Sequence, residues 1–162
     1  MSISMADDIR LNYTKTFSTF RQIIAAFPEE KWLEAHADDY YIPCRIAYHL
    51  AVFISRHLAG GFLDGDFSAK LPFGNWMEAT AETLPNKQEL LAYYNEIEAK
   101  AIKALESLTD EDLVKPVEFE RAWFGESQLG VHIYLIREIA AHTGELNKML
   151  IENGLEDIWV FR

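Results

Sequence analysis

The sequence predicts an all-α protein built as a four-helix bundle. Four segments carry apolar residues at the alternating spacing of three and four that is typical of an amphipathic helix, and no segment alternates convincingly at period two as a half-buried strand does. The chain has 162 residues, of which 49% are hydrophobic, which is enough for one domain with a proper core. We therefore expect residues 1–162 to form a single helical domain.

The first two helices are expected in residues 9–27 and 43–59. In the first, apolar residues recur at a 4-3-4-3-4 spacing until Pro28, which a helix rarely passes. The second begins with Pro43, which suits a first helical turn because its missing amide hydrogen would have had no partner there. Two glycines follow this helix, and glycine is a common helix stop.

The third and fourth helices are expected in residues 87–108 and 128–153. Asn86 followed three residues later by Glu89 is a variant of the capping box, which marks a helix start. Gly154 gives the fourth helix a left-handed stop. The apolar stripe that we assign to the fourth helix consists of Leu129, Ile133, Ile136, Ala140 and Leu150.

The connections around residues 61–85 and 109–127 are longer than a simple up-and-down bundle needs, and such lengths permit a crossover that links parallel neighbours. A short capped turn is expected at residues 109–113, before Pro116. The first connection is expected to pack over the bundle because it is rich in aromatic residues. These residues are Phe62, Phe67, Phe73 and Trp76.

Charge and composition exclude several classes of function. The formal net charge is −11 and no run of Lys or Arg occurs, so binding to nucleic acid or to an anionic membrane surface is not expected. No segment has the roughly 20 apolar residues of a membrane span, and the first residues are acidic where a secretory signal is basic. Cys44 is the single cysteine and cannot form an internal disulfide. We expect a cytoplasmic protein.

Three side chains form a candidate metal site. Glu138 and His142 are four residues apart, so on a helix they project from one side, about 6 Å apart along the axis. A carboxylate and an imidazole so placed can bind a divalent ion if another helix adds a third ligand, for which His49 is the candidate. His57 shares the apolar arc of His49 but lies two turns away, so at most one of the two belongs to a given site.

A structural role for these residues remains the alternative. His142 lies in an apolar arc and Glu138 at its polar border, and a lone histidine on an apolar face is more often a hydrogen-bonded core residue than a ligand. His36 and His132 carry little signal. Cys44 is expected to be a packing residue, because no histidine or basic residue is adjacent to it in sequence.

Three motifs together resemble the DinB-like superfamily. They are Tyr48-His49-Leu50, the segment from Ser107 to Leu113, and His142-Thr143-Gly144-Glu145-Leu146. The resemblance extends over most of the chain and implies a four-helix bundle of up-down-down-up topology. It also implies one metal-binding histidine on the second helix and an H-x-x-x-H pair on the last.

His49 and His142 match these positions, whereas Glu138 occupies the place of the first histidine of the pair. This replacement either shifts the preference toward harder ions or means that metal binding has weakened or been lost. The ion would be zinc, nickel, iron or manganese.

The resemblance implies a metal-dependent enzyme that acts on a small molecule, either as a hydrolase or as a transferase that uses a low-molecular-weight thiol such as bacillithiol or mycothiol. Metal-bound water is the expected nucleophile of a hydrolase, and no catalytic side chain is assigned. Tyr48 is a weak candidate for the pocket, because it is expected on the polar side of its helix. A homodimer is expected, as in many members of the superfamily.

Two alternatives stay open. One is a non-catalytic, stress-associated dimeric bundle or small-molecule-binding protein with a vestigial metal site. The other is a purely structural module whose histidines form hydrogen bonds in the core.

Overall fold

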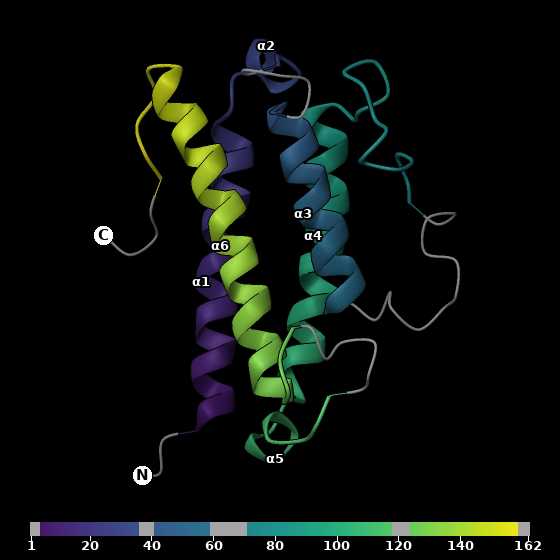
Figure 1. Ribbon diagram of the computed structural model, residues 1–162. Helices are drawn as coiled ribbons and strands as arrows, with labels where there is room; N and C mark the ends of the chain where they lie inside the picture. Colours follow the sequence, from purple (N-terminus) through teal and green to yellow (C-terminus); the bar gives the residue numbers. More distant parts are fainter. Residues whose placement is uncertain (1–3, 36–40, 59–70, 118–123, 159–162) are drawn as a thin grey trace.

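The computed structural model describes residues 4–35, 41–58, 71–117 and 124–158. Four long helices form the bundle: α1 (Met5–Ala26), α3 (Pro43–His57), α4 (Lys87–Glu106) and α6 (Gln128–Glu152) (Figure 1). Two single-turn helices, α2 (Glu29–Trp32) and α5 (Asp110–Leu113), lie in the connections. The described residues contain no strand, and an isolated antiparallel bridge joins Pro116 and Ser127. The predicted all-α four-helix bundle is confirmed.

Side-chain caps define where the helices begin. The Asn86 side chain accepts a hydrogen bond from the amide of Glu89, whose carboxylate accepts one from the Asn86 amide, so the predicted capping box is present. Thr109 and Asp112 make the same reciprocal pair at α5. Just after the last residue of α6, Gly154 has a φ of 77°, which is the left-handed conformation that favours glycine. The helix boundaries therefore lie close to those predicted from capping residues.

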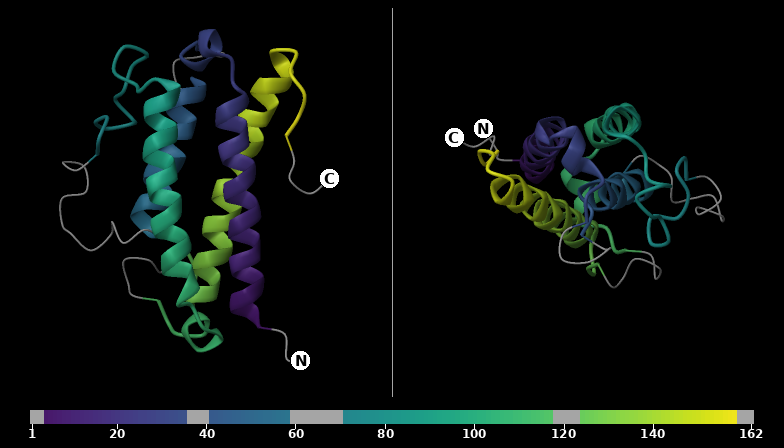
Figure 2. Two further views of the ribbon diagram at one scale, coloured as in Figure 1. Left: turned by 180° about the vertical axis from the view of Figure 1, so that it is seen from behind. Right: turned by 90° about the horizontal axis from the view of Figure 1, so that it is seen from above.

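The two long connections give the bundle its topology. The chain runs up through α1, down through α3 and α4, and up through α6, as the colours of Figure 1 show. Around the bundle, α1 contacts α4 and α6, and α3 also contacts α4 and α6. Figure 2, viewed from above, shows α1 beside α6 and α3 beside α4. The up-down-down-up order makes α3 and α6 antiparallel neighbours, and the candidate metal ligands lie on these two helices.

The core is dominated by aromatic and branched aliphatic side chains. Those of α1 follow the predicted stripe, since Tyr13, Phe17 and Phe20 are fully buried. In α4 a strict alternation of three and four residues would continue from Ala101 to Ala104. The structure instead buries Leu105 and exposes Ala104. This shift by one residue follows from the 3.6-residue turn, because a strict spacing of three and four slowly rotates around a straight helix.

The apolar stripe predicted for the last helix was wrong at Ile133 and Ala140, whereas Leu150 is fully buried and Leu129 packs against the core. Ile133 and Ala140 are exposed, and Ile136 is half-buried. The buried face consists of Val131, Leu135, Ile139, Thr143, Leu146, Asn147, Met149 and Leu150. Helix α6 carries two apolar stripes, and its contacts with α1 and α3 select the one that lies beside His142.

The connection at residues 71–85 packs against α3, as was expected from its aromatic residues. Phe73 and Trp76 pack on the core, whereas Phe62 and Phe67 lie outside the described residues. The prediction that Tyr48 faces the polar side of its helix was wrong, because Tyr48 is fully buried. Its hydroxyl donates to the Gly74 carbonyl at 2.9 Å and accepts from the Phe73 amide at 3.3 Å. The connection thus covers a face of α3 that the sequence pattern had assigned to solvent.

The seam between α1 and α4 contains an ion pair in which the carboxylate is buried and the guanidinium is partly exposed. Nη1 of Arg21 lies 2.7 and 2.6 Å from the two carboxylate oxygens of Glu98, whose side chain is only 8% exposed. The Tyr94 hydroxyl, in the same seam, donates to the Phe17 carbonyl. The polar groups of this seam therefore have partners within it.

Within the described ranges, no helix is both long and apolar enough to cross a membrane.

Candidate metal centre

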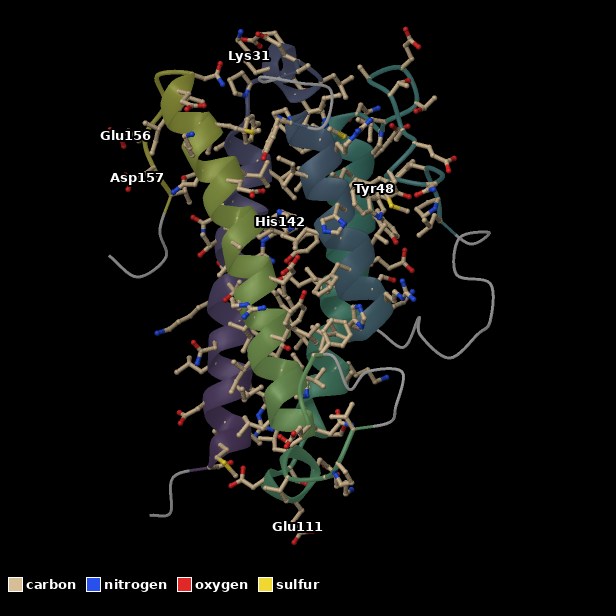
Figure 3. All side chains as sticks on the ribbon, viewed as in Figure 1. Lys31, Tyr48, Glu111, His142, Glu156 and Asp157 are labelled. Atoms are coloured by element: carbon tan, nitrogen blue, oxygen red, sulfur yellow. The ribbon has the colours of Figure 1, made fainter. Side chains whose placement is uncertain are left out.

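His49, Glu138 and His142 meet at the seam between α3 and α6. His49 lies near the middle of α3, and the other two lie one turn apart on α6. Figure 3 shows His142 on the side of α6 that faces α3. One ligand atom from each of the three residues lies within 4.8 Å of the others. These residues could therefore hold a metal ion together.

The distances are close to those of a coordination sphere. Zinc with bonds of about 2.1 Å and tetrahedral geometry sets its ligand atoms about 3.4 Å apart. Nε2 of His142 and Oε1 of Glu138 lie 3.4 Å apart. The widest separation among the three ligand atoms is at most 4.8 Å. The donor set of two imidazoles and one carboxylate is one that zinc, iron, nickel and manganese accept.

Glu145 orients the His142 ring. Its Oε2 lies 2.7 Å from Nδ1 of His142, one turn further along α6. A proton on Nδ1 is then donated to this carboxylate, which leaves the lone pair of Nε2 directed at Glu138 and the shared point. Metal-binding histidines in proteins commonly have such a carboxylate partner on the second nitrogen. The pair fixes the tautomer that a ligand needs.

His49 is held neutral by its surroundings. Burial, and secondly the charge of His142, lower the pKa of His49 from 6.5 to about 4. Its ring centroid lies 4.0 Å from that of Trp76 and 4.9 Å from that of His142. Nδ1 of His49 is buried and has no hydrogen-bond partner among the residues that the structure describes. A neutral imidazole is the form that binds metal.

The site is only partly covered. The side chains of His142 and Glu138 are 13% and 26% exposed, so solvent reaches the α6 half of the seam. Tyr134 lies one turn before Glu138, and its pKa is raised by its burial and then by the charge of Glu138. The guanidinium of Arg137 lies 4.7 Å from the centre of the Tyr134 ring. Three protein ligands and an open side are the arrangement of catalytic rather than structural metal sites.

His57 and His132, which the structure describes, do not join this cluster. His57 packs against Phe53 and Phe124, with ring centroids 4.6 and 5.0 Å away. His132 contacts the hydroxyl of Tyr13 through Nδ1 at 3.0 Å. His36 lies outside the described residues. The expectation that His49 and His57 would not share one site agrees with the cluster, which contains His49 alone of the two.

Cys44 is buried, and its thiol donates to the Pro85 carbonyl at 3.1 Å. Burial raises the pKa of this thiol well above its ordinary value, so Cys44 is unsuited to act as a nucleophile. This agrees with the packing role expected from the sequence.

Sequence reasoning missed the role of Glu145. The signal was available, because residues three apart on a helix are neighbours and a glutamate follows His142 at that spacing. The contact of Trp76 with His49 was less accessible, since it depends on the path of the 71–85 connection.

Comparison with known proteins supports the fold by structure. No family model and no curated protein matches the sequence. Among solved structures, the chain resembles a DinB-like protein from Bacillus cereus ATCC 10987, with a TM-score of 0.71 over 99% of this chain and 100% of that one. The chain has the DinB-like fold. The two sequences are 18% identical, and at this distance the likeness establishes the DinB-like fold alone.

Proposed function

We propose that the protein is a divalent-metal-dependent enzyme that acts on a small molecule, as a hydrolase or as a low-molecular-weight-thiol transferase. The observation that carries the proposal is the meeting of His49, Glu138 and His142, each with a ligand atom within 4.8 Å of the others. The ligands come from two neighbouring helices, so the bundle itself holds them in place.

Each of the three side chains has the form that metal binding requires. The low pKa of His49 keeps that ring neutral at pH 7. Glu145 holds the proton of His142 on Nδ1, so that Nε2 is free to act as a ligand. The carboxylate of Glu138 is partly exposed, which leaves a side from which a substrate can approach.

A divalent ion with an open position lowers the pKa of a coordinated water or thiol and so supplies a nucleophile near neutral pH. The residues of this chain would orient the ion and limit access to it. The Trp76 ring packs against His49 in a tilted arrangement and covers it, and the Phe53 ring lies 6.3 Å from the same imidazole, measured between ring centroids. The hydrolase and the thiol transferase share these requirements, and the substrate distinguishes them.

A competing explanation is an ion pair without metal. His142 has a carboxylate beside each ring nitrogen, Glu145 at 2.7 Å and Glu138 at 3.4 Å, and these contacts form without any metal. The buried Nδ1 of His49 argues against this explanation, because an ion pair on α6 gives that atom no role.

Metal analysis of the full chain tests the proposal. The protein is purified anaerobically, reconstituted with zinc, nickel, iron or manganese, and its metal content is measured after dialysis. We expect one ion per chain for at least one of the four metals. Metal content well below one per chain after every reconstitution would leave the ion pair as the better explanation.

Three variants locate the ion. His142→Ala should abolish binding, and Glu138→Gln should weaken it, because an amide oxygen is a poorer ligand than a carboxylate. His57→Ala is the matched control, since His57 lies two turns from His49 on α3 and outside the cluster. Unchanged metal content in both site variants would place the ion elsewhere.

The reaction class is then tested on the metal-loaded form. Thiol-conjugation and amide-hydrolysis substrates are screened in parallel, and His142→Ala serves as the inactive reference. Turnover in one series alone assigns the class. The homodimer that the resemblance implies stays a prediction, which sedimentation of the same samples measures.

A further inference from the structure

Arg45 lies on α3 one helical turn before His49. Residues four apart on a helix project from nearly the same side, about 6 Å apart along the axis. Arg45 is half-buried. Arg45 and His49 therefore project from nearly the same side of α3, one turn apart.

The 71–85 connection covers both residues. Its Trp76 ring packs against His49, and three residues later the Ala79 carbonyl accepts a hydrogen bond from Nη2 of Arg45. Two independent contacts thus place the guanidinium and the imidazole against one short segment. Arg45 and His49 therefore both pack against the 71–85 connection.

The guanidinium has unused hydrogen-bonding capacity. Arginine has five N–H donors and stays charged at any physiological pH. Nε of Arg45 is buried and has no acceptor, and no carboxylate in the described ranges forms an ion pair with this residue. A partly buried cation with an unmet donor is costly unless an anion completes it.

Holding the 71–85 connection is the simplest alternative role for Arg45. The bond to Ala79 accounts for one donor. This bond does not explain why the residue is charged, since a neutral side chain could donate to a single carbonyl equally well. It also does not explain why the buried Nε has no acceptor. Both remaining features are met by an acid group that binds the fork of the guanidinium through two parallel hydrogen bonds.

We propose that Arg45 binds the acid group of the substrate, so that the substrate is a small organic anion. Its reacting group would lie at His49, Glu138 and His142, and its carboxylate or phosphate one helical turn away. This inference rests on the proposed function, because it assigns the substrate class of the same site. Phe53 lies on α3 one turn after His49. The side of His49 opposite Arg45 is therefore apolar.

Ligand binding to the cobalt(II)-loaded full chain tests the inference without knowledge of the reaction. The probes are 3-mercaptopropionate and 3-mercapto-1-propanol, which share the thiol and differ in the acid group. Thiolate binding to cobalt is followed by visible absorption. We expect the acid to bind about tenfold more tightly than the alcohol, or better, because a hydrogen bond between charged groups favours it.

Three variants connect this preference to Arg45. Arg45→Gln should reduce the preference to less than about threefold, and Arg45→Lys should retain part of it, since lysine keeps the charge but loses the fork. Lys103→Gln is the charge-matched control on α4, which carries no ligand, and should leave the preference unchanged. Inorganic phosphate and acetate, added as competitors, distinguish a phosphate end from a carboxylate end of the substrate.

The outcomes separate the two proposals. Absence of a cobalt spectrum would refute the metal centre itself. A cobalt spectrum with equal binding of both thiols by the unmodified chain would overturn the role of Arg45 and leave the metal centre standing. This comparison uses no variant, so it holds even if Arg45→Gln fails to fold. A preference for the acid that persists in Arg45→Gln would also overturn the inference.

Discussion

The two seams of the bundle treat buried polar groups in opposite ways. Between α1 and α4, Glu98 is matched by Arg21, with both carboxylate oxygens engaged. Between α3 and α6, two imidazoles and one carboxylate lie close together. There the buried Nδ1 of His49 has no hydrogen-bond partner in the described part of the chain. The first seam satisfies its polar groups internally, as a structural contact does. The second would be completed by the metal ion that we propose to bind there, and for this reason the proposed function is assigned to it.

The largest expected effect breaks the satisfied seam. Arg21→Ala leaves the Glu98 carboxylate buried and unpaired, and should lower the free energy of unfolding by about 2–3 kcal/mol, less than a fully buried pair would because Arg21 is partly exposed. Chemical denaturation measures it. Metal affinity should not change. The double variant Arg21→Met with Glu98→Leu should recover most of the loss, and a loss as large as in the single variant would contradict this account.

The next effect concerns the seam between α3 and α6. Glu145→Ala removes the acceptor of the His142 Nδ1 proton and should weaken metal binding by about 10- to 100-fold, as loss of such a partner typically does. Isothermal titration measures the affinity. Glu145→Gln keeps an oxygen acceptor and should restore most of it. Equal affinities for all three proteins would show that Glu145 does not orient the ring.

Acid should destabilise the metal-free protein through His49. Burial and His142 lower the pKa of His49 from 6.5 to about 4, so between these pH values the unfolded chain binds more protons than the folded one. Stability from this residue is complete above pH 6.5 and falls as the pH drops to 4, by at most about 1.4 kcal/mol per pH unit. Unfolding of the chain and of His49→Gln across this range isolates the contribution. Parallel pH profiles would contradict it.

The smallest effect concerns the cover of the site. Tyr48→Phe removes the hydroxyl that binds Gly74 and Phe73, and should cost about 1 kcal/mol of stability. It should also loosen the segment that holds Trp76 on His49. Thermal unfolding measures the first effect, and tryptophan fluorescence quenching by cobalt(II) measures the second. A change in stability without any change in quenching would show that the Tyr48 hydroxyl does not hold Trp76 in place.

Local signals predicted the fold and most of the candidate site. The caps at Asn86 and Thr109 and the stop at Gly154 depend on neighbouring residues alone, so they could be recognised in the sequence. The environment of His142 was also recognised, because its apolar neighbours recur on one face of α6.

Features that depend on distant parts of the chain could not be predicted in this way. Helix α6 has two apolar stripes, and only contact with α1 and α3 decides which is buried, so Ile133 was misplaced. Tyr48 was assigned to solvent because the path of residues 71–85 over α3 is not a local property. The contact between Arg45 and Ala79 has the same origin.

The order of the helices has a consequence for how the protein matures. Because α3 and α6 come from opposite halves of the sequence, a growing chain that has not yet reached α6 carries only His49 of the three candidate ligands. A metal ion held by all three would therefore be taken up only after α6 has packed against α3, and bound metal would report that this packing is complete.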